Sequence, residues 1–158
     1  MGEEVNAYLT FSVGDNTFGV HVEKVIEIKE YEQPKAVPES MVYVKGVTEH
    51  REQIIPVIDA AAKFNIGEIE VTPQSCIVVL DIIKGAGLMS IGVLVDAVSD
   101  VFEADDTKLK VIETDYKPGY ISASYQRNDE LIMILNADKV FSETDIFALD
   151  TAVESFKK

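Results

Sequence analysis

The sequence predicts a mainly β fold in which two small β-barrels are related by an approximate two-fold axis and followed by a C-terminal helix. Three observations support this fold class. Most of the 158 residues fall into short apolar runs separated by turn residues. Two blocks of sequence recur in the same order in both halves of the chain. Helical periodicity is clear only near the C-terminus.

The first element is a β-hairpin near the N-terminus. Apolar and polar residues alternate along Tyr8–Val13 and again along Phe18–Val22, as in strands with one buried face. Between them, Gly14, Asp15 and Asn16 are residues that tolerate the positive φ angles of tight turns. The two segments are therefore expected to pair.

Three later segments form the expected interior. They are near-continuous apolar runs rich in Ile and Val, namely Gln53–Asp59, Cys76–Ile83 and Glu130–Leu135. Such runs are typical of strands that are buried on both faces. Ala60–Phe64 and the stretch around Lys24 are each expected to form a helical turn or two.

The C-terminal segment, residues 142–158, is predicted to be a helix. Its apolar residues recur at three- and four-residue spacing, at Ile146, Leu149, Val153 and Phe156. Ser142 suits the N-cap, with acidic residues in the first turn and Lys157 and Lys158 in the last. We expect this helix to lie across a sheet or the end of a barrel.

An internal repeat organises the chain. Phe18–Ile28 aligns without gaps with Ile91–Val101, 73 positions later, and Tyr43–Phe64 aligns with Tyr120–Phe141, 77 positions later. Two blocks in the same order imply a duplicated unit of roughly 65 to 70 residues. The halves, about 8–70 and 74–141, are each too small to bury much alone, so they are expected to share an interface. A groove is expected between them.

The composition narrows the classes of partner. The net charge is −14, which disfavours binding to nucleic acid and to the anionic surface of a membrane, because both need basic patches. No apolar run approaches the roughly 20 residues of a spanning helix, so no insertion into the membrane is expected. With no leader-like start and a single cysteine, Cys76, the chain is expected to be cytoplasmic.

Carboxylates are the first candidates for chemistry. Asp59, Asp81 and Asp96 each close an apolar strand, and a converging pair would suit acid–base catalysis in a small hydrolase or a ligand-binding barrel. The simpler interpretation is that they cap turns or helices, which is the commoner use of Asp at a strand end. A deep pocket holding two of these carboxylates would favour the enzyme.

The other reactive residues form no catalytic pattern. His21 and His50 are interpreted as half-exposed polar residues, and Cys76 as a small apolar residue of its strand. Lys84–Gly87 lacks the helix and spacing of a phosphate-binding loop and is predicted to be a hairpin turn. No cofactor, metal site or catalytic residue is therefore predicted.

The repeat also indicates a partner surface. Val25 and Glu27 in the first half match Val98 and Asp100 in the second, so an apolar and an acidic residue recur at equivalent positions. These residues either face the groove or belong to the core. Arg51, in a predicted turn, can hold a carboxylate at an interface or within the chain, or remain solvated.

These residues resemble the CheW-like domain family over residues 7–150. In the first half the matching motifs are Tyr8–Phe11 with Gly14-Asp15, Phe18–Val20, Val25–Ile28, Lys45–Val47, Arg51 and Ile54–Asp59. In the second half they are Gly92-Val93, Val95–Val101 and Leu131–Asn136. The similarity covers nearly the whole chain.

The resemblance implies two intertwined, SH3-like, five-stranded barrels and a protein without enzymatic activity. The family implies an adaptor that links the cytoplasmic tips of chemoreceptors to the regulatory domain of a CheA-type histidine kinase, in arrays at the inner face of the membrane. It places the receptor-binding groove at Val25, Glu27, Arg51, Ile77, Val98 and Val101. Kinase contacts are expected at barrel ends, near the hairpin that contains Gly46 and Ile55.

The sequence departs from the family pattern beside these contacts. Glu52 stands where glycine is usual, Glu49-His50 where Asn-Leu is common, Ala60-Ala61 where Leu-Arg is common, and Ser122 where glycine is usual. The changes add negative charge and remove a cation. They are consistent with a paralogue that serves a different receptor or kinase, including one in a pilus or developmental pathway.

Overall fold

The computed structural model describes residues 6–38, 40–111 and 119–157. The strands are β1 (Ala7–Val13), β2 (Asn16–His21), β3 (Val25–Glu30), β4 (Val44–His50), β5 (Gln53–Asp59), β6 (Cys76–Lys84), β7 (Gly87–Val95), β8 (Ala97–Glu103), β9 (Leu109–Val111), β10 (Ile121–Arg127) and β11 (Glu130–Leu135). The helical segments are η1 (Val22–Lys24), α1 (Ala60–Lys63), η2 (Asp106–Lys108), α2 (Ala137–Val140) and α3 (Glu143–Lys157).

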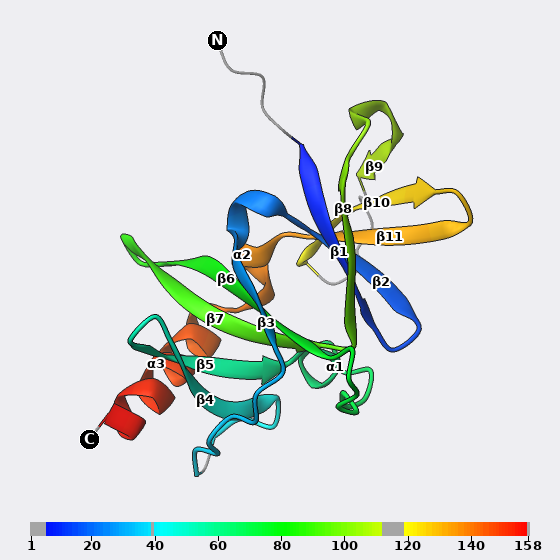
Figure 1. Ribbon diagram of the computed structural model, residues 1–158. Coiled ribbons are helices and arrows are strands. Elements are labelled where there is room, and N and C mark those ends of the chain that lie inside the picture. Colours follow the sequence, from blue (N-terminus) through cyan, green and yellow to red (C-terminus); the bar gives the residue numbers. More distant parts are fainter. Residues whose placement is uncertain (1–5, 39, 112–118, 158) are drawn as a thin grey trace.

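The strands form two sheets, and the mainly β fold class is confirmed. Sheet A has the order β8-β1-β2-β11-β10-β9, and sheet B has the order β3-β6-β7-β5-β4. Figure 1 shows the two sheets as separate bodies that meet where β3 and β8 pass from one to the other. These are the two SH3-like barrels that were predicted.

The two halves of the chain exchange their first hairpins. According to the repeat, β1 to β5 correspond to β6, β7, β8, β10 and β11, so both sheets contain equivalent strands in the same order. Sheet A joins β1 and β2 to strands of the second half, and sheet B joins β6 and β7 to strands of the first. Neither half supplies a complete sheet, which is the physical meaning of intertwined barrels.

The register at the exchange points is the same in both sheets. Gly92 lies opposite Val57 in the parallel pair of β7 with β5, and Gly19 lies opposite Ile134 in the parallel pair of β2 with β11. A Cβ atom on Gly92 would lie 2.9 Å from a side-chain carbon of Ile77, and one on Gly19 would lie 3.1 Å from Ile134. The repeated glycine is therefore needed where the exchanged strands pack closely.

A second repeated contact ends the last strand of each half. The Asp59 N–H donates to the Tyr43 carbonyl, and the Asn136 N–H donates to the Tyr120 carbonyl, both at 2.8 Å. Asp59 and Asn136 then cap α1 and α2 through their side-chain oxygens. The helical turns expected at Ala60–Phe64 and around Lys24 are confirmed as α1 and η1.

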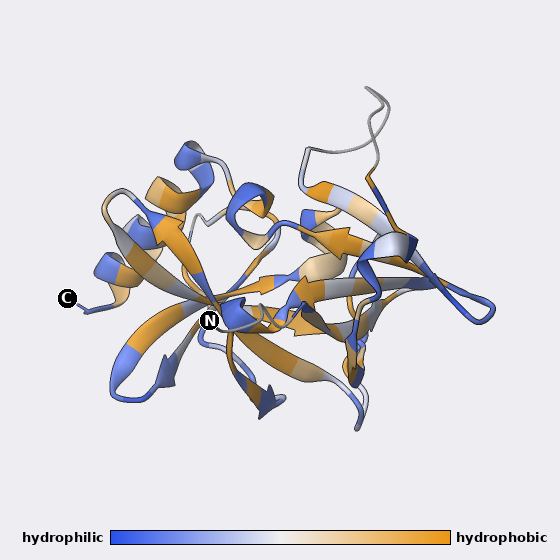
Figure 2. Ribbon diagram, turned by 90° about the horizontal axis from the view of Figure 1, so that it is seen from above, coloured by the Kyte–Doolittle hydropathy of each residue, from blue (hydrophilic) through white to orange (hydrophobic). Residues whose placement is uncertain are grey.

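Apolar side chains from both sheets form the core. Figure 2 shows hydrophobic residues along the strands and hydrophilic ones at the hairpin tips. β5 is buried from Ile55 to Asp59 and β6 from Ile77 to Leu80, as predicted for their runs, but Ile83 near the hairpin end of β6 is 51% exposed. The prediction that β11 is buried on both faces is wrong, because Leu131 is exposed near the hairpin end and only Ile132, Ile134 and Leu135 are buried.

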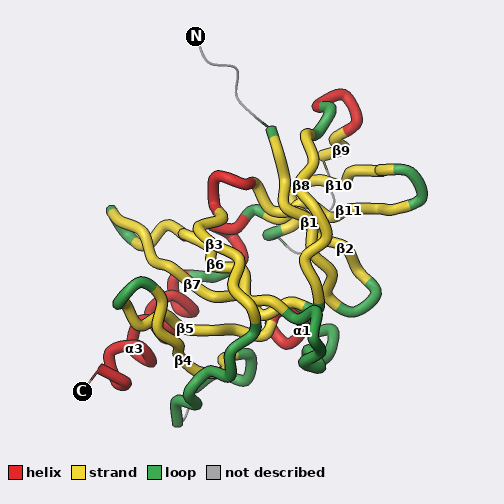
Figure 3. Tube along the Cα trace, viewed as in Figure 1, coloured by secondary structure: helices red, strands yellow, loops and turns green. Residues whose placement is uncertain are grey.

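The predicted C-terminal helix is α3, which lies against β5 and β4 at one end of the molecule (Figure 3). Ser142 caps it as predicted: its hydroxyl accepts the Asp145 N–H at 3.0 Å, and the Asp145 carboxylate accepts the Ser142 N–H at 2.9 Å. Leu149 and Val153 are buried, and Phe156 lies at the edge of the contact. The last residue, Lys158, lies outside the described residues.

Asp145 also ties α3 to the barrel. The Tyr43 hydroxyl donates to its carboxylate at 2.5 Å, and Lys63 lies 3.6 Å away. Burial opposes ionisation of Asp145, but the hydrogen bonds from Tyr43 and Ser142 and the charge of Lys63 hold the pKa of its carboxyl below the ordinary value. Burial and the hydrogen bond to Asp145 raise the pKa of Tyr43.

The turn between β4 and β5 is strained. Arg51 and Glu52 have φ angles of 49° and 66°, a backbone conformation that favours glycine or asparagine. In the equivalent turn between β10 and β11, Asn128 is the repeat mate of Arg51 and has a φ of 55°, a conformation that asparagine tolerates better than arginine. Glu52, at a φ of 66° where the family usually has glycine, holds its conformation at a cost in backbone energy.

Replacing Glu52 by glycine is expected to raise the free energy of unfolding by roughly 0.5 to 1 kcal/mol, because relief of the positive φ exceeds the extra chain entropy of glycine. Urea unfolding of the two proteins measures the difference. Glu52→Gln is the matched control, since it removes the charge and retains the strain. Equal stabilisation by glycine and glutamine would show that charge, and not backbone conformation, was the unfavourable feature.

Candidate functional site

The two crossover strands, β3 and β8, are equivalent in the repeat and join the two barrels. β2 leads through η1 into β3 of sheet B, and β7 leads through Asp96 into β8 of sheet A. A cleft of about 600 Å³ lies where the end of β3 approaches the start of β8. Its lining includes Tyr31, Ala97, Val98 and the loop of residues 72–75. This is a groove between the barrels, as the repeat predicts.

The residues predicted for the receptor-binding groove have different environments. Val98 lines the cleft, and Val101 on the same strand is 56% exposed. Val25, the repeat mate of Val98, is half-buried, and both of these valines pack partly against the core. Arg51 is exposed in the β4–β5 turn. The structure thus leaves Val98, Val101 and Arg51 accessible to a partner.

One accessible apolar residue was missed by sequence reasoning. Ile28 is 44% exposed on β3, and it is the repeat mate of Val101, 73 positions earlier. The repeat offset that paired Val25 with Val98 would also have paired Ile28 with Val101. Apolar side chains are therefore presented at matching positions of both crossover strands.

The structure contradicts three of the predicted contact residues. Ile77 is completely buried, where it packs beneath Gly92, so it cannot line a groove. Gly46 and Ile55 are also buried, because they pair within the β4–β5 hairpin that faces the core. Ile55 is 3% exposed and lines a cleft beside α3. The accessible part of the hairpin is its turn.

Glu27 and Asp100, the repeated acidic residues, close the barrels. Glu27 on edge strand β3 lies 3.0 Å from the His50 ring on edge strand β4, so this pair joins the two edges of sheet B. Asp100 on edge strand β8 lies 2.9 Å from Arg127 at the end of β10. The repeat aligns Glu27 with Asp100 and His50 with Arg127. The two contacts are therefore equivalent in the repeat.

The second pair is surrounded by further contacts. Arg127 also donates to Glu130 at 3.1 Å, and its guanidinium lies 4.8 Å from the centre of the Phe102 ring. The buried Thr10 hydroxyl donates to Asp100 at 2.6 Å. The hydrogen bonds from Arg127 and Thr10 hold the pKa of Asp100 below its ordinary value, and Asp100 raises the pKa of Arg127.

The prediction that His50 is a half-exposed residue is wrong. His50 is 5% exposed, because it lies at the end of β4 opposite Gln53 and under the edge of sheet B. Its Nδ1 faces Glu27, and its Nε2 is buried without a hydrogen-bond partner in the described part of the chain. His21 is half-exposed as predicted, and its Nδ1 accepts the Glu23 N–H at the start of η1.

The three strand-end aspartates have structural roles. Asp59 is buried and accepts the N–H groups of Ala62 and Ile69 at 3.1 and 2.9 Å. Asp81 accepts the Ser90 hydroxyl across the β6–β7 hairpin, and Asp96 accepts the Gly14 N–H at 2.6 Å. None of the three lines the cleft between the barrels. The capping interpretation is confirmed for Asp59, which caps α1, and for Asp96, which binds a turn N–H, whereas Asp81 lies within β6 and pairs across the hairpin instead.

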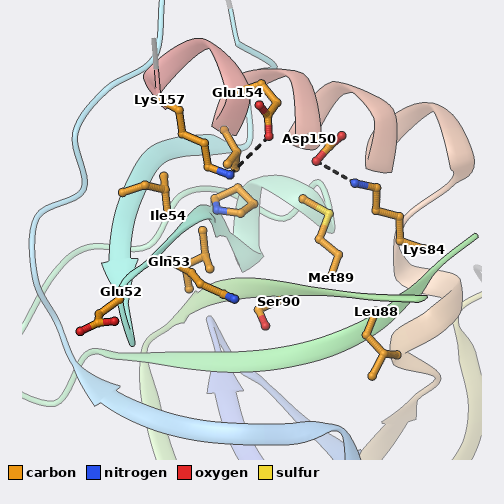
Figure 4. A pocket seen from close by; sticks show the side chains of 13 residues that line it. Glu52, Gln53, Ile54, Lys84, Leu88, Met89, Ser90, Asp150, Glu154 and Lys157 are labelled. Atoms are coloured by element: carbon orange, nitrogen blue, oxygen red, sulfur yellow. Dashed lines mark hydrogen bonds and ion pairs between the residues drawn. The ribbon is translucent and has the colours of Figure 1, made fainter. Parts of the chain in front are cut away.

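A second cleft, of about 560 Å³, lies between α3 and the β4–β5 and β6–β7 hairpins. Figure 4 shows Leu88, Met89 and Ile54 along one side and α3 along the other. Two ion pairs border it, Lys84 with Asp150 at 2.8 Å and Lys157 with Glu154 at 3.4 Å. The lining is mixed, which suits a protein surface better than an enclosed small-molecule site.

Residues 6–38, 40–111 and 119–157 contain no group of three or more His, Cys, Asp or Glu side chains arranged to bind a metal ion. None of the helices that the structure describes combines the length and the apolar character needed to cross a bilayer.

Comparison with known protein families assigns this chain to a family. The CheW-like domain family matches residues 7–145, which is most of the chain. The chain belongs to the CheW-like domain family. The resemblance inferred from the motifs is confirmed, and CheW-like proteins are scaffold and adaptor proteins of chemotaxis.

Full-length relatives agree with this assignment. The CheW-like chain is 26% identical to the chemotaxis protein CheW of Klebsiella aerogenes over 98% of this chain and 93% of that one. It is 28% identical to a probable CheW of Rhizobium etli over 87% and 88%. The crystal structure of the scaffolding protein TtCheW from Thermoanaerobacter tengcongensis has the same fold, with a TM-score of 0.78 over 89% of this chain and 90% of that one, at 23% identity.

Proposed function

We propose that this CheW-like chain is a non-catalytic adaptor that couples the cytoplasmic tips of chemoreceptors to the regulatory domain of a CheA-type histidine kinase. It acts in the cytoplasm, in signalling arrays at the inner face of the membrane. Separate surfaces bind the two partners at once, so that a change in the receptor reaches the kinase by contact. The family assignment supports this function, and residues 7–150 are proposed to form the adaptor unit.

The observation that carries the receptor-binding proposal is the pair of crossover strands. Ile28 and Val101 expose apolar side chains at equivalent positions, and Val25 and Val98 lie three residues before them. A helical receptor tip presents apolar side chains in rows, which this pair of strands can contact. Glu27 and Arg51 add one charge of each sign beside that surface, and such charges set specificity.

The kinase is proposed to bind the end of the sheet B barrel. The cleft beside α3 lies there, and Leu88 is 63% exposed at the rim of the cleft. An apolar centre with a charged rim is the composition expected of a specific interface. Contacts at this end leave the crossover strands free for the receptor.

Val101→Asp is expected to weaken binding to the cognate receptor tip by at least 10-fold, since an unpaired charge would be placed at an apolar contact. Titration calorimetry with soluble tip fragments of each chemoreceptor from the same genome measures the effect. Because Val101 is exposed, the melting temperature should stay near that of the unmodified protein.

Leu88→Asp is the matched control, because it places the same charge at a similarly exposed apolar residue on the other barrel. It should leave receptor binding unchanged and weaken binding to the kinase regulatory domain. Equal receptor affinity for the unmodified protein and Val101→Asp would contradict the proposed surface. Failure of the unmodified protein to bind any receptor tip and any kinase domain would contradict the function itself.

A further inference from the structure

Glu27 is held at one carboxylate oxygen and open at the other. Its Oε2 lies 3.0 Å from His50 Nδ1. No hydrogen bond or ion pair from the residues that the structure describes reaches its Oε1, and 41% of its side chain is exposed. One oxygen of the carboxylate therefore lies against His50, and the other is available to a partner.

The buried position of His50 lowers the stability of the fold. The ring is buried, and its Nε2 has no partner among the described residues. A buried nitrogen without a hydrogen bond destabilises a protein, and a leucine in the same place would avoid that cost. Residues that break such a rule are expected at functional positions more than elsewhere.

The second half shows how the same edges are closed without this cost. Arg127 occupies the position equivalent to His50, and its guanidinium binds Asp100 through two nitrogens and Glu130 through one. Thr10 adds a further hydrogen bond to Asp100. The carboxylate oxygens of Asp100 are all used within the chain, whereas Glu27 keeps one oxygen free.

We propose that His50 is a positioning residue that presents the Glu27 carboxylate to a Lys or Arg side chain of the chemoreceptor tip. This inference rests on the proposed function, because Glu27 belongs to the proposed receptor-binding surface and its charge would help to select the receptor. By restricting the rotamers of Glu27 before binding, the His50 contact lowers the entropy lost when the salt bridge to the partner forms. A free Glu27 side chain would lose that entropy at the interface.

The test is a double-mutant cycle on receptor affinity with soluble tip fragments of each chemoreceptor from the same genome. His50→Leu is expected to raise the Kd about 3- to 10-fold, the effect of releasing one long side chain at an interface. In a Glu27→Gln background the same replacement should change the Kd by less than about twofold, because the neutral amide gains little from the histidine.

Arg127→Leu is the matched control, since it removes the equivalent pair in the other barrel. It should lower stability in urea, and its effect on the receptor Kd should be the same in the Glu27→Gln background, because Arg127 contacts Asp100 and not Glu27. His50→Leu should fold normally, because it removes an unpartnered buried nitrogen.

Each outcome of the cycle decides the inference. Binding of His50→Leu with unchanged affinity, or an equal loss in the Glu27→Gln background, would overturn the positioning role while leaving the adaptor function standing. Failure of the unmodified chain to bind any tip would overturn both.

Discussion

Replacing Gly46 by alanine is expected to lower the free energy of unfolding by about 3 kcal/mol, one of the largest effects of any small substitution in this protein. Gly46 has a φ of 144°, and a Cβ atom there would lie 2.0 Å from the backbone oxygen of Lys35. That oxygen accepts the Val47 N–H at 2.8 Å, and the Lys35 N–H donates to the Val47 carbonyl at 2.9 Å. Alanine must therefore break this bridge between β4 and the preceding loop.

Thermal unfolding should register the Gly46→Ala loss as a fall of roughly 6 to 12 °C in melting temperature. Gly87→Ala is the control, because the nearest atom to a Cβ there is the Lys84 oxygen at 3.9 Å, an ordinary contact. Similar melting temperatures for Gly46→Ala and Gly87→Ala would refute the steric argument. Any loss of kinase binding by Gly46→Ala is then a consequence of misfolding, since Gly46 itself is buried.

Replacing Asp59 by alanine is expected to cost about 3 kcal/mol, because two backbone N–H groups lose their acceptor together. Asp59 is 1% exposed, and its two oxygens accept the N–H groups of Ala62 and Ile69. A buried donor without a partner costs about 1–3 kcal/mol, and a lost N-cap about 1 kcal/mol. Urea unfolding of the Asp59→Ala protein measures the loss.

Asn136 provides the internal comparison for Asp59. It caps α2 at the equivalent position, but among the residues that the structure describes its side chain accepts only the Asp138 N–H. Asn136→Ala is therefore expected to cost about 1 kcal/mol. If both replacements cost the same, the contact of Asp59 with the Ile69 N–H contributes nothing to stability.

Most of the fold could be predicted from local sequence. Alternation along Tyr8–Val13, turn residues at Gly14 and Asp15, and three- and four-residue spacing in α3 all describe interactions between near neighbours, and the structure has these elements. The internal repeat predicted two equivalent barrels, because segments of similar sequence adopt similar folds. The failures, at β11 and His50, concern burial, which depends on strands distant in sequence.

The candidate site was less predictable. The repeat paired Val25 with Val98 and Glu27 with Asp100, and both pairs lie on crossover strands. It could not show that Ile77 is buried beneath Gly92, or that Glu27 and Asp100 turn toward the opposite edge of their own barrels. Apolar and acidic residues recur at the same sequence spacing whether their side chains face a partner protein or contact other residues of their own chain.

The sequence alone determined the class of fold, the duplication and the family, since these depend on residue order and periodicity. The tertiary structure alone decided which half completes which barrel. It also showed that Gly46 must be glycine although its repeat mate is Ala123, because the obstructing atom belongs to Lys35. The physical reason is that a side chain's exposure, its partner and the space around its Cβ atom are set by strands that meet only after the two halves have exchanged hairpins.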